Sequence, residues 1–144
     1  MIRYTSVNTK MPVFPRRKIS SWMKIIAERL NKRVGEVSCI FCTDSKILEV
    51  NREFLSHDYY TDIITFDYTE GDKISGDMFI SVDTVSSNAI KYKVPFEHEL
   101  YRVMIHGILH LCGIEDKTPE KRIEMERYEN EALPVLWEFL QTPV

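Results

Sequence analysis

Cysteine is scarce in this 144-residue sequence, and long apolar runs are absent. The three cysteines, Cys39, Cys42 and Cys112, cannot all pair with one another, which argues against a secreted protein built on disulfides. No run reaches the ~20 apolar residues of a membrane span, and residues 1–30 lack the pattern of a signal peptide. We therefore expect a cytoplasmic protein that has no membrane partner.

Cys39 and Cys42 have the spacing of a zinc-binding pair, but they occur within the apolar stretch EVSCIFCTD. This stretch is typical of a buried strand, and strand positions three apart point to opposite faces of a sheet. A zinc pair needs both sulfur atoms on one side of a turn. We therefore expect these two cysteines to be core residues.

Basic residues are scarce except near the N-terminus. The chain has a formal net charge of −3, yet residues 1–33 contain nine Lys or Arg and one acid, Glu28. That segment is therefore +8, and the remainder, with 10 basic and 21 acidic residues, is −11. Such asymmetry is a sign of nucleic-acid contact by one face, although, taken alone, a solvated basic helix explains it better.

The sequence contains no repeat, low-complexity tract or flexible linker, so we expect one domain over residues 1–144. Hydrophobic periodicity predicts an α+β domain, in which a small mixed sheet of about four strands packs against helices. Asp44 is the expected N-cap of the second helix, and Pro134 is expected to kink or divide the last one. The predicted strands are 1–7, 37–43, 63–68 and 77–82, the last two as an antiparallel hairpin. The predicted helices are 18–33, 45–55, 83–92, 96–112 and a segment opening at Thr118 and Pro119.

Two histidines lie one turn apart in the stretch HGILHLCGIED, which covers residues 106–116. The predicted helix around them is apolar nearly all round, so it should be central and buried. His106 and His110 are i and i+4, and their rings can reach one ion. Gly113 suits a left-handed helix end, after which Glu115 or Asp116 can return beneath the rings. Two imidazoles, one carboxylate and a metal-bound water would form an open catalytic zinc site.

The same pair can also be read without a metal, because histidines at this spacing occur by chance on many helices. The following glycine and carboxylates favour a metal, as does the cost of leaving two buried rings unpaired. A metallopeptidase of the HExxH type would need a glutamate at position 107, where this sequence has Gly107. That chemistry would require Glu115 as its base.

Several motifs resemble those of the YbeY family of metal-dependent endoribonucleases, which act in rRNA maturation. The HGxLHLxG signature occurs at residues 106–113, and NREFLSHDYYTDIITF at 51–66 is similar to a second family motif. GDMFIS at 76–81 is similar to a third, and order, spacing and length agree. The resemblance implies an endoribonuclease that cleaves single-stranded RNA and has the small ribosomal subunit as its partner. It also implies that the protein binds one divalent metal ion, with Zn²⁺ as the first candidate and Mn²⁺ or Ni²⁺ as alternatives.

Two positions depart from the usual family pattern. Asp116 stands where the family usually has a third histidine, so we assign His106, His110 and Asp116 as the metal ligands. A carboxylate is a competent zinc ligand, although it shifts the preference toward harder ions such as manganese. Leu55 stands where the family usually has an arginine that could bind phosphate. Glu115 is our candidate proton carrier, and the nucleophile, water or a 2′-hydroxyl, stays open.

Five further residues are candidates for RNA contact. Arg17 and Lys18 lie in the basic segment, where phosphate neutralisation is expected. Tyr59 could stack on a base, and His57 could replace the missing arginine. Asp62 could order the entry to the substrate groove, or serve simply as a turn or capping residue.

Three functions remain open on the sequence. The first is the endoribonuclease described above, acting as a monomer. The second is a non-catalytic ribosome-assembly factor whose metal only joins the helix to the following loop, a reading that Leu55 supports. The third is a metallohydrolase of peptide or other amide substrates, which the basic N-terminal segment disfavours.

Overall fold

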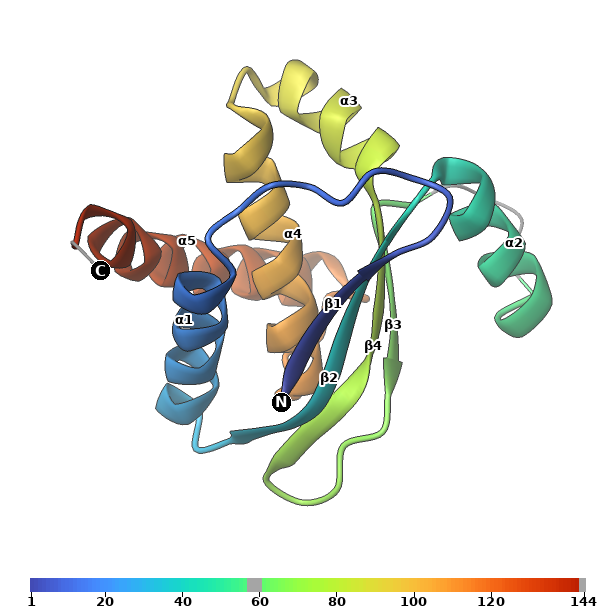
Figure 1. Cartoon of the computed structure of the whole chain (residues 1–144). Helices are drawn as coiled ribbons and strands as arrows, with labels where there is room; N and C mark the ends of the chain where they lie inside the picture. Colours follow the sequence, from blue (N-terminus) through green and yellow to red (C-terminus); the bar gives the residue numbers. More distant parts are fainter. Residues whose placement is uncertain (57–60, 143–144) are drawn as a thin grey trace.

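The computed structural model describes residues 1–56 and 61–142 of the chain (Figure 1). The strands are β1 (Ile2–Ser6), β2 (Arg33–Cys42), β3 (Ile63–Asp67) and β4 (Lys73–Ser81). The helices are α1 (Arg16–Arg29), α2 (Asp44–Phe54), α3 (Val82–Tyr92), α4 (Phe96–Leu111) and α5 (Pro119–Gln141). In the part of the chain that is described, no helix is long and apolar enough to cross a membrane.

The four strands form one mixed sheet in the order β1-β2-β4-β3. β1 pairs parallel with β2, and β2 pairs parallel with β4, whereas β3 and β4 form an antiparallel hairpin. β2 begins four residues earlier than predicted, because Arg33 and Val34 pair with the equally extended start of β4, before a register shift. The predicted α+β class, with its mixed four-stranded sheet and its hairpin, is confirmed.

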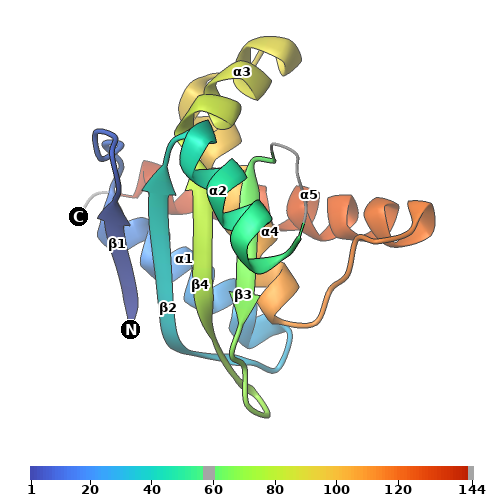
Figure 2. The same ribbon diagram turned by 90° about the vertical axis from the view of Figure 1, so that its right-hand side faces the viewer.

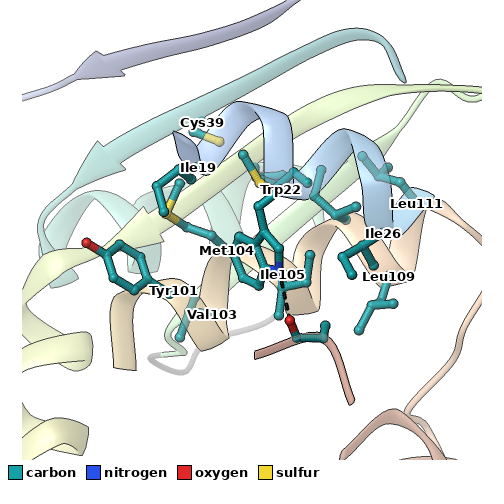
Figure 3. Close-up of a cluster of buried hydrophobic side chains, with 14 of the residues drawn as sticks. Ile19, Trp22, Ile26, Cys39, Tyr101, Val103, Met104, Ile105, Leu109 and Leu111 are labelled. Carbon is teal, nitrogen blue, oxygen red and sulfur yellow. Dashed lines mark hydrogen bonds between the residues drawn. The ribbon is translucent and has the colours of Figure 1, made fainter. Parts of the chain in front are cut away.

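The helices cover the two faces of the sheet unequally. α1, α4 and α5 lie on one face, while α2 lies on the other (Figure 2). α4 is central, since it contacts α1, α3, α5, β3 and β4. The main core fills the space around it, and there the Trp22 indole nitrogen donates a 2.9 Å hydrogen bond to the carbonyl oxygen of Ala132 (Figure 3). The helix that carries the two histidines is therefore held from several sides.

The two neighbouring cysteines face opposite sides of the sheet, as predicted. Cys39 belongs to the main core, whereas Cys42 belongs to a smaller cluster under α2 with Ile47, Val50 and Ile64. Both thiols are free and buried, and burial raises the pKa of the Cys42 thiol to about 11. They act as small hydrophobic residues.

Two local predictions are wrong. Thr43, not Asp44, is the N-cap of α2, because the Thr43 hydroxyl accepts the hydrogen bond from the Lys46 amide. The Asp44 carboxylate instead accepts a 2.6 Å hydrogen bond from the Ser81 hydroxyl, which joins α2 to the start of α3. Pro134 does not divide the last helix, since α5 continues through it to Gln141.

Gly107 allows α4 to approach the sheet closely. A Cβ atom at this position would overlap the Met78 sulfur of β4 and press against the Ile63 side chain of β3. Any larger residue would therefore push the helix off the sheet or force these buried side chains to move. This packing explains why a glutamate is excluded between the two histidines.

Candidate active site

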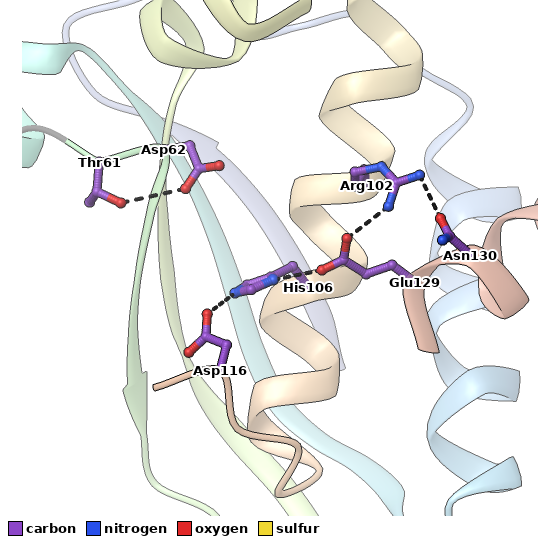
Figure 4. A network of polar contacts seen from close by, with 7 residues as sticks. All are labelled: Thr61, Asp62, Arg102, His106, Asp116, Glu129 and Asn130. Carbon is purple, nitrogen blue, oxygen red and sulfur yellow. Dashed lines mark hydrogen bonds and ion pairs between the residues drawn. The ribbon is translucent and has the colours of Figure 1, made fainter. Parts of the chain in front are cut away.

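The chain reverses after α4 as the sequence predicted. Gly113 has a φ of 99°, a left-handed conformation that favours glycine, and its amide bonds to the His110 carbonyl oxygen at 3.0 Å. This return brings Asp116 back to the helix, where one carboxylate oxygen lies 3.2 Å from His106 Nε2 (Figure 4). His106, His110 and Asp116 together line a cavity of about 210 Å³.

The opposite edge of the His106 ring contacts a buried carboxylate from α5. Glu129, whose residue is only 5% exposed, places one oxygen 2.8 Å from His106 Nδ1. Arg102 donates a 2.9 Å hydrogen bond to the other Glu129 oxygen, and a further one at 3.0 Å to the side-chain oxygen of Asn130 (Figure 4). A neutral His106 that donates from Nδ1 to Glu129 leaves the Nε2 lone pair facing Asp116 and the cavity.

Negative charge is concentrated around His106. Burial by itself would lower the pKa of His106, but the hydrogen bond that His106 donates to Glu129 and the charges of Glu129, Asp116 and Asp62 raise it. Burial also raises the pKa of Asp62. Three carboxylates around one imidazole, with Arg102 as the nearby cation, attract positive charge.

The arrangement fits a metal ion at two of the three predicted ligands. Two ligands of one tetrahedral zinc ion, each ~2.0–2.1 Å from the metal, lie about 3.3 Å apart. The separation of His106 Nε2 and Asp116 is 3.2 Å. Among the described residues, however, no group of three or more His, Cys, Asp or Glu side chains already surrounds a common point for a metal. His110 lines the same cavity.

The other predicted site residues are scattered. Glu115 is exposed and pairs with Lys121, whose hydrogen bond lowers the pKa of the Glu115 carboxyl group. It is absent from the described residues that line the two cavities beside His106. Glu115 is thus paired with Lys121 at the surface, but it lies near enough to His110 for the His110 charge to contribute to its lowered pKa.

The predicted RNA contacts also lie in different places. Asp62 lines a second cavity, to which His106 and Glu129 also belong. Arg17 and Lys18 lie on α1, and Lys18 donates a hydrogen bond to the Thr142 carbonyl oxygen beyond α5. His57 and Tyr59 fall outside the described residues.

Sequence reasoning missed Glu129 and Arg102. The buried face of α5 contains Met125, Ala132 and Leu136, and Glu129 lies on that same face. A carboxylate on a buried helix face is uncommon unless it is paired. This signal could have identified Glu129, although nothing local names its partner.

Fold and site define a small α+β domain whose central helix presents a histidine and carboxylate centre. A family model described as Endoribonuclease YbeY matches residues 5–136. A protein named Endoribonuclease YbeY from Phocaeicola vulgatus is 58% identical over 94% of this chain and 99% of its own length. One of the same name from Porphyromonas gingivalis is 48% identical over 95% of this chain and 91% of its own.

A solved structure agrees. The solution structure of TM1509 from Thermotoga maritima aligns with this chain at a TM-score of 0.64 and a sequence identity of 28%. The alignment covers 98% of this chain and 94% of the TM1509 chain. The chain belongs to the YbeY endoribonuclease family. The resemblance inferred from its motifs is thereby confirmed.

Proposed function

We propose that this chain is a metal-dependent endoribonuclease that cleaves single-stranded RNA during rRNA maturation. It acts as a monomer in the cytoplasm, with the small ribosomal subunit as its partner. The observation that carries the proposal is the pairing of His106 with Asp116 on one edge and with buried Glu129 on the other. The family relationship supports the same reaction.

His106, His110 and Asp116 would hold one divalent ion, Zn²⁺ in preference to Mn²⁺ or Ni²⁺. When bound, such an ion polarises a phosphate oxygen and lowers the pKa of water. Glu129 holds the His106 ring so that Nε2 faces the cavity, and Arg102 holds Glu129 in turn. The protein thereby orients its ligand before the ion arrives.

RNA must be attracted by charges outside this acidic centre. Leu55, at the end of α2, contributes an apolar side chain to the wall of the smaller cavity where the family usually has arginine. Phosphate binding therefore falls to more distant cations, for which Arg17, Lys18 and the rest of the basic N-terminal segment are our candidates. His57, Tyr59 and Asp62 remain candidate contacts to the RNA. The nucleophile is water or the adjacent 2′-hydroxyl.

The first test is metal content, measured by elemental analysis of the native chain, Asp116→Ala and Glu115→Ala. We expect close to one equivalent in the native protein and in Glu115→Ala, because Glu115 is exposed and paired with Lys121. Asp116→Ala should retain little. Equal metal in all three would remove Asp116 as a ligand, and absence of metal from all three would refute the metal site.

Cleavage of a single-stranded RNA by the native chain and by His106→Ala then tests the activity. We expect cleavage to be lost while the circular dichroism spectrum and the melting temperature are retained. An RNA with one 2′-deoxy position at the cut distinguishes the nucleophiles, since only 2′-hydroxyl attack needs that group. An unfolded His106→Ala protein would instead favour the non-catalytic assembly factor, in which the metal serves only as a structural link.

A further inference from the structure

A second, larger cavity, of about 690 Å³, also has His106 in its lining. Residues of α4 and α5 form most of its wall, and His106 and Glu129 belong to it. His106 thus borders both the proposed metal site and a space large enough for a ligand, because binding cavities commonly measure ~300–1,000 Å³. The role proposed for His106 does not use this space.

Glu99, in the first turn of α4, is the most unusual residue of this cavity. It is 5% exposed and lines the cavity. Within residues 1–56 and 61–142 its carboxyl group has neither a hydrogen bond nor an ion pair; Asp62, Arg102 and Glu129 affect it through their charges. Burial raises the pKa of Glu99 to about 6. Among the described residues no fully buried side-chain oxygen lacks a partner, so the Glu99 oxygens are accessible from the cavity, where an acceptor is suited to a ligand that brings a donor.

Aromatic rings form another part of the cavity wall. The His98 ring packs on the Trp137 indole, with ring centroids 4.6 Å apart and an interplanar angle of 39°. Tyr92, 57% exposed, adds a third ring to the lining. Aromatic surfaces of this kind bind planar groups by stacking.

The charge of the lining excludes phosphate as the bound group. Arg102 contributes a guanidinium group to the cavity, but this group is already bonded to Glu129. Four carboxylates line the same cavity, those of Asp62, Glu99, Glu126 and Glu129. A phosphate would be repelled, whereas a neutral planar group with N–H donors would satisfy Glu99 and stack on the rings. Guanine offers two adjacent N–H donors on its Watson–Crick edge.

We propose that this cavity is a nucleobase subsite, which receives an unpaired guanine of the RNA while Glu99 accepts its N–H groups and Trp137 with His98 stack on it. Glu99 and His106 lie on one face of α4, about 10 Å apart along its axis. The guanine would thus bind close to the cut. This inference rests on the proposed function, since it assumes an RNA substrate.

The test is binding of fluorescein-labelled, ten-nucleotide RNAs by anisotropy at pH 8, with EDTA present so that no cleavage occurs. One RNA is oligouridine, and the other has a single central guanosine. We expect the guanosine RNA to bind the native chain about tenfold more tightly, the discrimination of one good base contact. Glu99→Gln should abolish this preference. Glu126→Gln, which removes the same charge from an exposed position of the same cavity, should retain it.

A second measurement on the native fold uses tryptophan emission. Guanosine RNA should quench the emission of the native chain more than oligouridine does, and Trp137→Phe should remove this difference, since Trp22 is fully buried. Equal affinity for the two RNAs, or a preference that survives Glu99→Gln, overturns the subsite and leaves the nuclease proposal standing. Failure to bind either RNA overturns both.

Discussion

The Glu129 carboxylate orients the His106 ring, the first ligand of the proposed metal site. It bonds to Nδ1 of His106 at 2.8 Å and is itself held by Arg102 at 2.9 Å. A ring nitrogen that is occupied in this way fixes both the orientation of the ring and the nitrogen left free. Because Glu129 is buried, water competes little for the bond.

Glu129→Gln should therefore weaken metal binding. The amide can still accept a hydrogen bond from Nδ1, but the negative charge behind the ligand is lost, and we expect affinity to fall about tenfold to a hundredfold. Competition with a chromogenic zinc chelator measures the dissociation constant. Glu131→Gln is the matched control, because Glu131 is exposed on the same helix and pairs with Arg127. Unchanged affinity in a folded Glu129→Gln protein would contradict the role of Glu129.

At the scale of elements, the packing of α4 on β3 and β4 sets the depth of the site. Gly107 lies where the helix meets Met78 and Ile63. Met78 is fully buried, so it cannot move aside freely. The helix therefore tolerates a residue of poor helix propensity because only that residue fits.

The sign of the stability change caused by Gly107→Ala tests this explanation. In an open helix, alanine in place of glycine adds ~1 kcal/mol of stability, but here we expect a loss of about 1 kcal/mol from overpacking. Urea denaturation measures the change in the free energy of unfolding. In a Met78→Val background, which removes the crowding sulfur, the penalty should shrink. A gain in stability from Gly107→Ala alone would refute the close approach.

Element prediction succeeded where periodicity is strong and failed at boundaries. The helices and the hairpin follow from repeating apolar positions, which each segment carries in itself. The N-cap of α2 was misplaced because Thr43 and Asp44 are both good capping residues. The choice between them depends on Ser81, which binds the Asp44 carboxylate from another part of the chain.

At the scale of the whole molecule, burying Glu99 should make stability depend on pH. The pKa of Glu99 is raised from 4.5 to about 6 by burial and by Asp62, against the opposing charge of Arg102, with Glu129 adding to the rise. The folded state binds the Glu99 proton more tightly than the unfolded state does. The stability that this proton adds to the fold is therefore fully present below pH 4.5 and is lost as pH rises through about 6. The ionised group therefore destabilises the fold at neutral pH.

Glu99→Gln should remove this dependence. Relative to the native chain, the variant should gain up to about 2 kcal/mol at pH 8 and under about 1 kcal/mol at pH 5. Urea denaturation of both proteins at the two pH values measures the difference. Glu126→Gln, at an exposed position, should show no such trend. A gain that is equal at both pH values would contradict the burial of an ionisable Glu99.

The sequence by itself determined the helices, the hairpin and the return of the chain at Gly113, because these depend on residues a few positions apart. It therefore predicted that Asp116 would reach the histidine helix, and the 3.2 Å contact with His106 agrees. Only the tertiary structure decided that Glu129, 23 residues beyond His106, would stand behind it, and that Glu99 would face a cavity. Those contacts depend on how α5 packs against α4, which the whole core fixes and no local pattern encodes.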